Sequence, residues 1–220
     1  MKKGSFYFLS FLLICFSLNV FAQDDDKDVK TIALVPQYML NNGIKVDFEF
    51  KLASEKQWIN IAPQFYIDAE GNKEFDSGAR DDFYDEMVGI GIDVSHKIFL
   101  TEKELPFGSY FGYGLTNQFF SLKYEGSVTE PYYENGLQYW RTVSKVANSS
   151  ILKIGPNIFI GYQAEFKDLI FIDAYLGYGG RYSFHFSDFE SPKEFNSVVW
   201  DYGHIGTLFI GGVRVGIVLK

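Results

Sequence analysis

The clearest pattern along the chain is a strict alternation of apolar and polar residues. Between Ile44 and Leu52 every second residue is apolar, and each residue between is charged. A period of two places all the apolar side chains on one face of an extended strand, whereas a helix would scatter them around its axis. The segment from Thr31 to Leu40 alternates in the same way, and the Asn-Asn-Gly sequence at 41–43 is a tight-turn signal. The pattern therefore predicts a β-hairpin.

The same alternation recurs in six further segments of the length that a tilted strand needs to cross a bilayer. These segments are 58–68, 88–98, 110–124, 152–162, 170–182 and 207–219. Their apolar face carries Ile, Val, Leu and Phe, and their other face carries glycine and charges of both signs. Pro36, Pro63 and Pro156 lie on the apolar face, and since proline removes a ladder hydrogen bond we expect bulges there.

The connections between these segments alternate in length. Those at 53–57, 101–107 and 165–168 are short, and those at 69–86, 125–149 and 187–203 are long and polar. Such sorting is typical of a transmembrane barrel, whose two ends face different compartments. We expect the long loops to contact a ligand or a partner protein.

The predicted fold is all-β, an eight-stranded antiparallel up-and-down transmembrane β-barrel over residues 30–220. Glycines on the polar face would leave room in a narrow lumen filled by side chains, so a wide pore is not expected. Aromatic residues near the strand ends are interpreted as girdles at the two membrane interfaces. They are Trp58, Phe99, Phe107, Tyr124, Tyr162, Phe166, Tyr182, Trp200 and Tyr202. The alternative is a soluble, exported, lipocalin-like barrel with its apolar face inside.

The charged residues of the minority face are predicted to pair inside the lumen, because opposite charges that leave water need partners. This lumen charge network consists of Lys45, Asp47, Glu49, Lys51, Asp93, Lys153, Asp173, Arg181 and Arg214.

The N-terminus has the features of a signal peptide. Lys2 and Lys3 precede an uncharged apolar stretch, and Val20-Phe21-Ala22 before Gln23 fits the cleavage rule. We predict a signal peptide at 1–22 and an acidic spacer at 23–29. Cys15 is the one cysteine of the sequence, so the mature chain would have no thiol and no disulfide.

Composition narrows the function classes. Hydrophobic residues make up 47% of the chain, too many for a disordered protein, yet a mean hydropathy of −0.05 shows that polar residues dilute them throughout. The net charge is −8 and no Lys/Arg cluster is visible, which argues against nucleic-acid binding.

With this signal peptide, the alternating strands and a last strand from Thr207 to Leu219, the chain resembles the small eight-stranded outer-membrane barrels of Gram-negative bacteria, of the OmpA-transmembrane-domain, OmpX or porin-like kind. The resemblance covers about residues 30–220. It implies the cell outer membrane, contact with outer-membrane lipid and lipopolysaccharide, no cofactor, and a monomer or a subunit of a membrane complex. Many such proteins end in an aromatic residue, whereas this chain ends in Lys220.

One sequence resembles the His-x-Ser pair of the lipid A 3-O-deacylases. His185 and Ser187 form the pair, and Glu194 is the accompanying acid. A histidine beside a serine hydroxyl can act as a general base. However, Asp188 stands where that family has asparagine, and the pair has the parity of Arg181, the predicted lumen side. A lipid A-modifying hydrolase is therefore the alternative to the structural or interaction role that we expect.

Two further sets of side chains bear on metal and ligand binding. His96 and His204 are isolated, and the acidic loop 69–86 has no EF-hand spacing, so no metal site is predicted. The aromatic residues of the loop 125–149 could form a recognition patch or pack over the barrel mouth. These residues are Tyr132, Tyr133, Tyr139 and Trp140.

Overall fold

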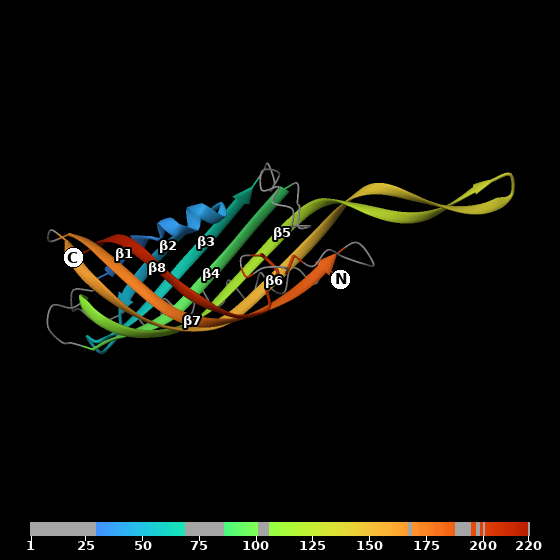
Figure 1. The fold of residues 1–220 in the computed structure, drawn as a ribbon. Helices are drawn as coiled ribbons and strands as arrows, with labels where there is room; N and C mark the ends of the chain where they lie inside the picture. Colours follow the sequence, from blue (N-terminus) through green and yellow to red (C-terminus); the bar gives the residue numbers. More distant parts are fainter. Residues whose placement is uncertain are drawn as a thin grey trace.

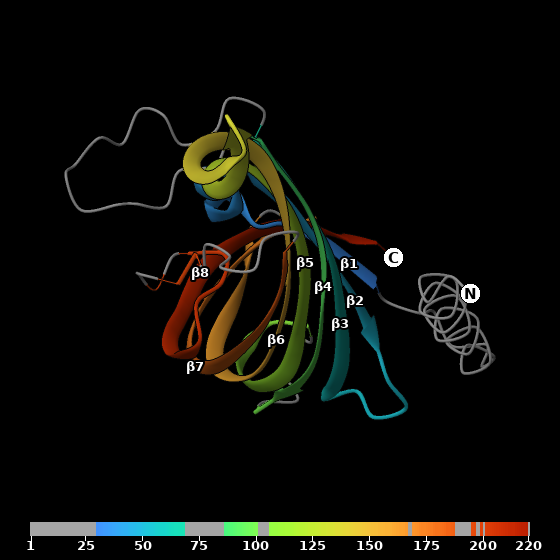
Figure 2. The same cartoon turned by 90° about the vertical axis from the view of Figure 1, so that its right-hand side faces the viewer.

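The computed structural model is a closed antiparallel barrel in which each strand pairs with the next in sequence and β1 pairs with β8 (Figures 1 and 2). It describes residues 30–68, 86–100, 106–166, 169–187, 195–196, 199 and 201–219. The strands are β1 (Lys30–Leu34), β2 (Gly43–Lys51), β3 (Gln57–Asp68), β4 (Glu86–Phe99), β5 (Gly108–Glu134), β6 (Leu137–Phe166), β7 (Ile170–Ser187) and β8 (Gly206–Leu219). The eight-stranded up-and-down barrel is thus confirmed.

The short connections lie at the end of the barrel where Lys30 of β1 pairs with Leu219 of β8. We call this the short-loop end and the opposite end the long-loop end. The predicted signal peptide at 1–22, the spacer at 23–29 and nearly all of the loop 69–86 lie outside the described residues. Among the residues that the structure does describe, no helix has the length and apolar character needed to span a bilayer.

The side chains of β2 show which face of the sheet is inside. Lys45 is 6% exposed, and Asp47 and Glu49 are fully buried, whereas Ile44 on the other face is 51% exposed. Around the ring the outward face repeats this pattern with exposed apolar side chains. Examples are Phe65, Ile67, Val88, Ile90, Ile158, Ile160, Leu176 and Phe209. This arrangement is the reverse of what the lipocalin-like alternative requires.

Large aromatic side chains fill the lumen by lying across glycines of the neighbouring strand. Phe159 of β6 is the direct partner of Gly112 in β5, and a Cβ atom at Gly112 would lie 2.4 Å from the Phe159 ring. The same relation joins four other cross-strand pairs. They are Gly43 with Tyr66, Gly89 with Phe120, Gly161 with Tyr110, and Gly216 with Phe171. The glycines of the polar face therefore give space to aromatic rings in a narrow barrel.

The first predicted strand is shorter than expected. It ends at Leu34, and Pro36 opens a 3-10 helix, η2 (Pro36–Asn41), that leads into β2. Proline favours a first helical turn because its φ is already helical and it has no N–H to leave unpaired. Asn42 ends the helix at a left-handed φ of 55°. The Asn-Asn-Gly signal thus marks the end of a helix, and the predicted tight hairpin turn is wrong.

The bulges expected at the other two prolines are also wrong. The β2–β3 register is the same on both sides of Pro63, from the pair Lys45 and Gln64 to the pair Phe48 and Ile61, so no residue is inserted. The β6–β7 register is likewise unchanged across Pro156. Each proline interrupts the ladder on one side of its strand and stays paired on the other, where Pro63 faces Ile92.

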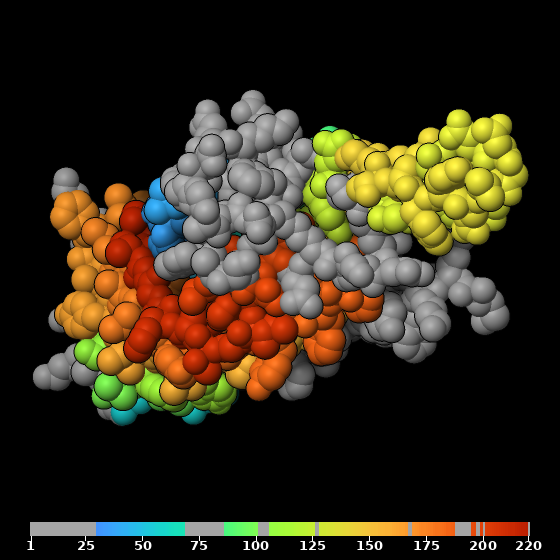
Figure 3. Space-filling view, turned by 45° about the vertical axis from the view of Figure 1, so that its right-hand side comes forward, coloured from blue at the N-terminus to red at the C-terminus, as the bar shows by residue number. Residues whose placement is uncertain are grey.

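The predicted loop at 125–149 is instead a long hairpin. β5 and β6 stay paired up to Glu134 and Leu137, across a turn in which Asn135 and Gly136 have φ of 51° and 79°. Two left-handed residues are what the I′ turn of a tight hairpin needs, and Asn-Gly is its usual sequence. β4 pairs with β5 up to Lys123, and β7 ends its pairing with β6 at Ser149. Residues 124–148 therefore extend past the barrel as a two-stranded ribbon (Figures 1 and 3).

The predicted aromatic girdles are only partly present. Tyr162, Phe166 and Tyr182 point outward and are exposed. The others in the described part of the chain pack on the inside: Trp58, Phe99 and Tyr124 are buried, and Phe107 and Tyr202 pack against buried clusters. Trp200 lies outside the described residues. The interpretation was wrong for the buried ones because it used distance from strand ends and ignored parity.

A first prediction tests the aromatic–glycine packing. We expect Gly112→Ala to lower the free energy of unfolding by about 1–3 kcal/mol, because the new methyl group would displace a packed Phe159 ring. Gly180→Ala is the matched control, since the nearest side-chain atom would lie 3.8 Å away. Urea unfolding of the refolded barrel measures both variants. Equal midpoints for the two would refute this account of the lumen.

Candidate functional site in the barrel lumen

Arg214 of β8 stands at the centre of a buried group of charges. Its Nε lies 3.1 Å from Asp47 Oδ2, and its Nη1 donates to Glu49 Oε1 at 3.0 Å and lies 3.4 Å from Asp173 Oδ2. All three carboxylates are fully buried, and Arg214 is 3% exposed. One guanidinium, with its fixed fork of donors, thus connects β8 with the adjacent β7 and, past β1, with β2.

Lys97 of β4 is the second buried cation of this group, and the sequence analysis missed it. Its Nζ donates to Asp173 Oδ2 at 2.9 Å, to Glu49 Oε1, and to Gln163 Oε1 at 3.2 Å. It also lies 4.3 Å from the centre of the Tyr110 ring. Its parity is that of Asp93 on the same strand, so the alternation that identified the other lumen charges could have found it.

Neutral donors add hydrogen bonds to all three carboxylates, although Asp47 Oδ1 stays buried without a hydrogen-bond partner. Thr31 donates its hydroxyl to Glu49 at 3.1 Å, Asn60 donates its amide to Asp47 at 3.1 Å, and Tyr110 donates its hydroxyl to Asp173 at 2.7 Å. A buried ion pair is tolerated only when its remaining hydrogen bonds are made, because removal of each charge from water costs several kcal/mol. The network therefore ties the strands together only as a complete unit.

A second pair, Lys45 with Asp93, lies beside this network. Lys45 Nζ donates to Asp93 Oδ2 and also lies 5.1 Å from the ring of Tyr38, which η2 brings over the lumen. Asp93 Oδ1 and Asn60 Oδ1 are buried and have no hydrogen-bond partner. Both residues line a cavity of about 50 Å³. Its walls are Tyr38, Lys45, Asn60, Asp93, Ser95, Thr116, Asn157, Phe159, Tyr175, Arg181, Ile210 and Arg214.

The structure thus brings together part of the predicted charge network. Six of its residues lie in these two groups: Lys45, Asp47, Glu49, Asp93, Asp173 and Arg214. Lys51, at the end of β2, forms no ion pair with any described residue. Lys153 and Arg181 lie toward the long-loop end and likewise have no carboxylate within 4 Å in the described part of the chain.

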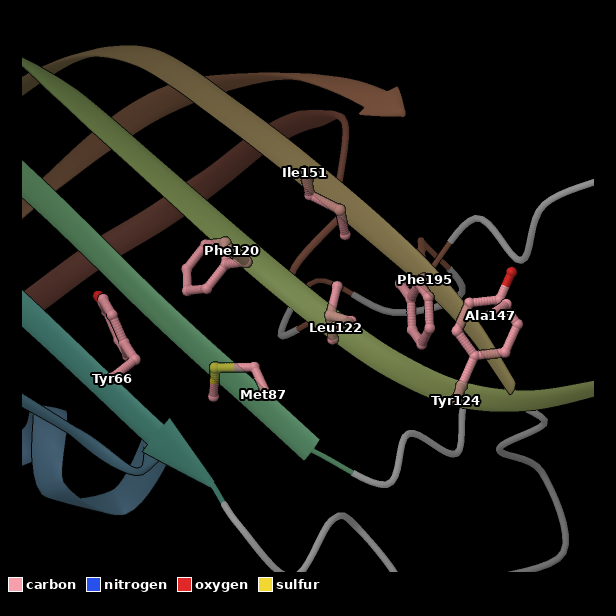
Figure 4. Close-up of a cluster of buried hydrophobic side chains, with 8 residues drawn as sticks. All are labelled: Tyr66, Met87, Phe120, Leu122, Tyr124, Ala147, Ile151 and Phe195. Carbon is pink, nitrogen blue, oxygen red and sulfur yellow. The ribbon is translucent and has the colours of Figure 1, made fainter. Parts of the chain in front are cut away.

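Aromatic clusters close the lumen on both sides of the charges. Toward the short-loop end, Trp58, Phe99, Tyr110 and Phe159 pack together. Toward the long-loop end a larger cluster combines side chains of β3 to β6 with Phe195 from the β7–β8 connection (Figure 4). Tyr202 of the same connection packs on Phe120 with ring centres 4.7 Å apart. The charged layer thus lies between two apolar layers.

The candidate catalytic pair does not form a dyad in this structure. His185 and Ser187 both lie on the lumen side of β7, but neither ring nitrogen of His185 has a hydrogen-bond partner. Glu194 lies outside the described residues. His96 Nδ1 is within 2.9 Å of the Tyr113 hydroxyl, and no group of metal-ligating side chains is present among the described residues.

A second prediction tests the central cation. Arg214→Met leaves three carboxylates with fewer donors, and we expect it to lower the free energy of unfolding by about 3–5 kcal/mol. Arg141→Met is the control, because Arg141 pairs with Glu130 on the exposed ribbon, where solvent screens the ion pair and little stability depends on it. Urea unfolding of both variants gives the comparison. A loss below 1 kcal/mol for Arg214→Met would contradict the network.

Comparison with known proteins gives a structural likeness. No protein-family model matches the chain, and no curated protein matches it. The crystal structures of CarO2 and CarO from Acinetobacter baumannii are similar to it, each with a TM-score of 0.43 and 11% sequence identity. The alignments cover 87% of this chain and 98% and 97% of those proteins. At this identity, what the residues of this barrel do has to follow from its own geometry.

Proposed function

We propose that this protein is an outer-membrane β-barrel whose lumen is closed and whose role is structural or interactive, through the ribbon that extends from its long-loop end. The observation that carries the proposal is the band of exposed apolar side chains around a closed ring with a charged interior. Outer-membrane lipid and lipopolysaccharide would be the immediate surroundings of such a barrel.

The apolar band supports a lipid environment on energetic grounds. Phe209 is 80% exposed, Ile67 68% and Ile160 63%, and they belong to strands on different sides of the ring. Soluble monomers rarely expose contiguous apolar patches of more than a few hundred Å². A closed ring also satisfies its backbone hydrogen bonds internally, which hydrocarbon demands of any spanning structure.

The closed lumen supports an interactive role over a transport role. The cavity between the two aromatic layers measures about 50 Å³, far below the roughly 300–1,000 Å³ of ordinary small-molecule pockets. Beside it, the ion pair of Lys97 in β4 with Asp173 in β7 crosses the lumen, and Arg214 of β8 joins the same acid. A solute could cross only after the network and the packed rings had separated.

The ribbon is built to hold its shape outside the barrel. On one face Tyr132 stacks on Tyr139 with centroids 5.5 Å apart, and Arg141 Nη2 donates to Glu130 at 2.6 Å. Hydrogen bonds from Lys145 and Arg141 hold the pKa of Glu130 below its usual value. These contacts link the two strands at several levels.

The other face of the ribbon offers a contact surface. Tyr133 is 72% exposed and Trp140 65% exposed, and Pro131 is the direct partner of Trp140. Exposed aromatic rings on an ordered support are frequent anchors of protein and ligand contacts. Beyond Lys123 the edges of the ribbon pair with no other described strand, so a partner strand can add there.

A third prediction tests the location and the closed lumen. We expect the protein in the outer-membrane fraction, with faster gel mobility when unheated than after boiling, because a folded barrel stays compact in detergent. In planar bilayers we expect no stable conductance steps from the wild type. Recovery from the soluble periplasm would overturn the location, and steady ohmic steps would overturn the closed lumen.

A fourth prediction tests the ribbon. Deletion of residues 126–145, with the strands rejoined by Asn-Gly, should leave the heat-modifiable mobility unchanged, because no described contact from this part stabilises the barrel wall. Crosslinking from position 140 in cells should capture a partner in the full-length protein. The matched position 139, on the opposite face, should capture it much less. Equal capture at both positions would contradict a contact face at Trp140.

A further inference from the structure

Two cations in the lumen differ from all those of the buried network. Lys153 of β6 and Arg181 of β7 face the interior near the long-loop end, and neither forms an ion pair with a described residue. Within the network, Lys45, Lys97 and Arg214 each contact at least one carboxylate. The contrast calls for a counter-charge, because an uncompensated charge withdrawn from water is costly.

Arg181 is directed into the cavity described above. Its guanidinium Nη1 donates to the carbonyl of Gly180 at 2.8 Å, and its other donors have no hydrogen-bond partner among the described residues. The glycines beside it make this position available. A Cβ atom at Gly155 would lie 2.7 Å from Nη1, and one at Gly179 would lie 3.1 Å from it.

Lys153 adds a second positive charge beside Arg181. In the β6–β7 register Lys153 faces Ser183, so Arg181 is the next residue along on the same face of the sheet. Lys153 Nζ lies 5.3 Å from the centre of the Phe120 ring. The carboxylate of Asp201 attracts the Lys153 charge but does not lie within ion-pair distance of it. Two like charges held at adjacent positions repel each other unless an anion lies between or beside them.

The far side of the cavity has hydrogen-bond acceptors that lack a donor. Asp93 Oδ1 and Asn60 Oδ1 are buried acceptors without a donor. Asp93 is already matched in charge by Lys45, so a second cation there would be repelled by Lys45. A neutral O–H group would satisfy these acceptors without that repulsion. The cavity therefore suits a ligand with negative oxygens on one side and a hydroxyl on the other.

We propose that this cavity is a binding site for a protonated phosphate group. Arg181 holds its charged oxygens, Lys153 adds positive charge from the neighbouring position outside the cavity wall, and Asp93 and Asn60 accept from its O–H. The volume of about 50 Å³ corresponds to roughly four water positions, which one tetrahedral oxyanion replaces. Sulfate carries the same charge but no proton near neutral pH, so the acceptor side selects against it. The ligand is the free hydrogen phosphate ion, because a monoester is larger than the cavity and is mostly a dianion without an O–H near neutral pH.

The test uses the whole barrel, refolded from urea into detergent so that the ligand enters before the lumen closes. Inorganic phosphate, sulfate, glycerol phosphate and glycine are each present during refolding, at constant ionic strength. Retained phosphate is measured after gel filtration, and the dissociation constant is measured by equilibrium dialysis. We expect one phosphate per chain, with binding at least tenfold tighter than that of sulfate.

Variants separate the proposed site from general anion binding. Arg181→Gln should weaken phosphate binding about tenfold or more, because it loses a charge-assisted contact. Lys153→Gln should weaken it less, because Lys153 does not line the cavity and acts only through its nearby charge. Arg141→Gln on the exposed ribbon removes the same charge outside the lumen and should leave the dissociation constant unchanged. If Arg181→Gln fails to refold, Lys153→Gln and Arg181→Lys are measured in its place. Wild-type affinity for phosphate in both variants would refute the site.

The outcomes are distinct. Equal binding of phosphate and sulfate would remove the roles of Asp93 and Asn60, and so the proposal as stated. Retention of glycine in place of phosphate, or no retained ligand in the wild type, would overturn it. Tighter binding of glycerol phosphate than of the free ion would contradict a cavity sized for a single oxyanion.

Discussion

The contact of Arg214 with three buried carboxylates is the interaction around which the interior of this barrel is arranged. It joins β8 to β2 and β7, and Lys97 of β4 shares two of the same acids. An apolar exterior forces this solution, because charges that alternate with Ile, Val and Phe along a strand have nowhere else to go. Once inside, they need partners from across the ring, and a closed ring of eight strands brings those partners within reach.

The aromatic layers make the network stronger as well as inaccessible. Trp58, Phe99 and Tyr110 cover it on one side, and Phe120 with Phe195 and Tyr202 closes the lumen on the other. Exclusion of water lowers the local dielectric, which strengthens each satisfied contact and raises the cost of each unsatisfied one. The rings fit because glycines of the neighbouring strands lie beneath them, so the composition rich in glycine and aromatics has a single geometric cause.

The sequence predicted the barrel and the parity of its faces because both follow from a local period of two. The same parity places Lys97 and Trp58 inside the barrel, so both positions were predictable from the sequence. The Asn-Gly sequence at 135–136 likewise indicates the turn of the long hairpin. Other features of the lumen could not be predicted from the sequence. Which acid meets Arg214 depends on the stagger of strands far apart in sequence, and the placement of Phe195 depends on a connection without periodicity.

The balance of positive and negative charge differs along the length of the lumen, because the acidic residues lie mainly in one half. Glu49 and Asp173 lie toward the short-loop end with their cations. In the long-loop half, β6 and β7 bring Lys153 and Arg181 to positions where no carboxylate of the described residues lies within 4 Å. Among the described residues these two adjacent charges are uncompensated, and apolar residues of similar size would fill the space at lower cost in a barrel that needed only stability. The compensated half accounts for the fold, and the uncompensated half is where a ligand would be held.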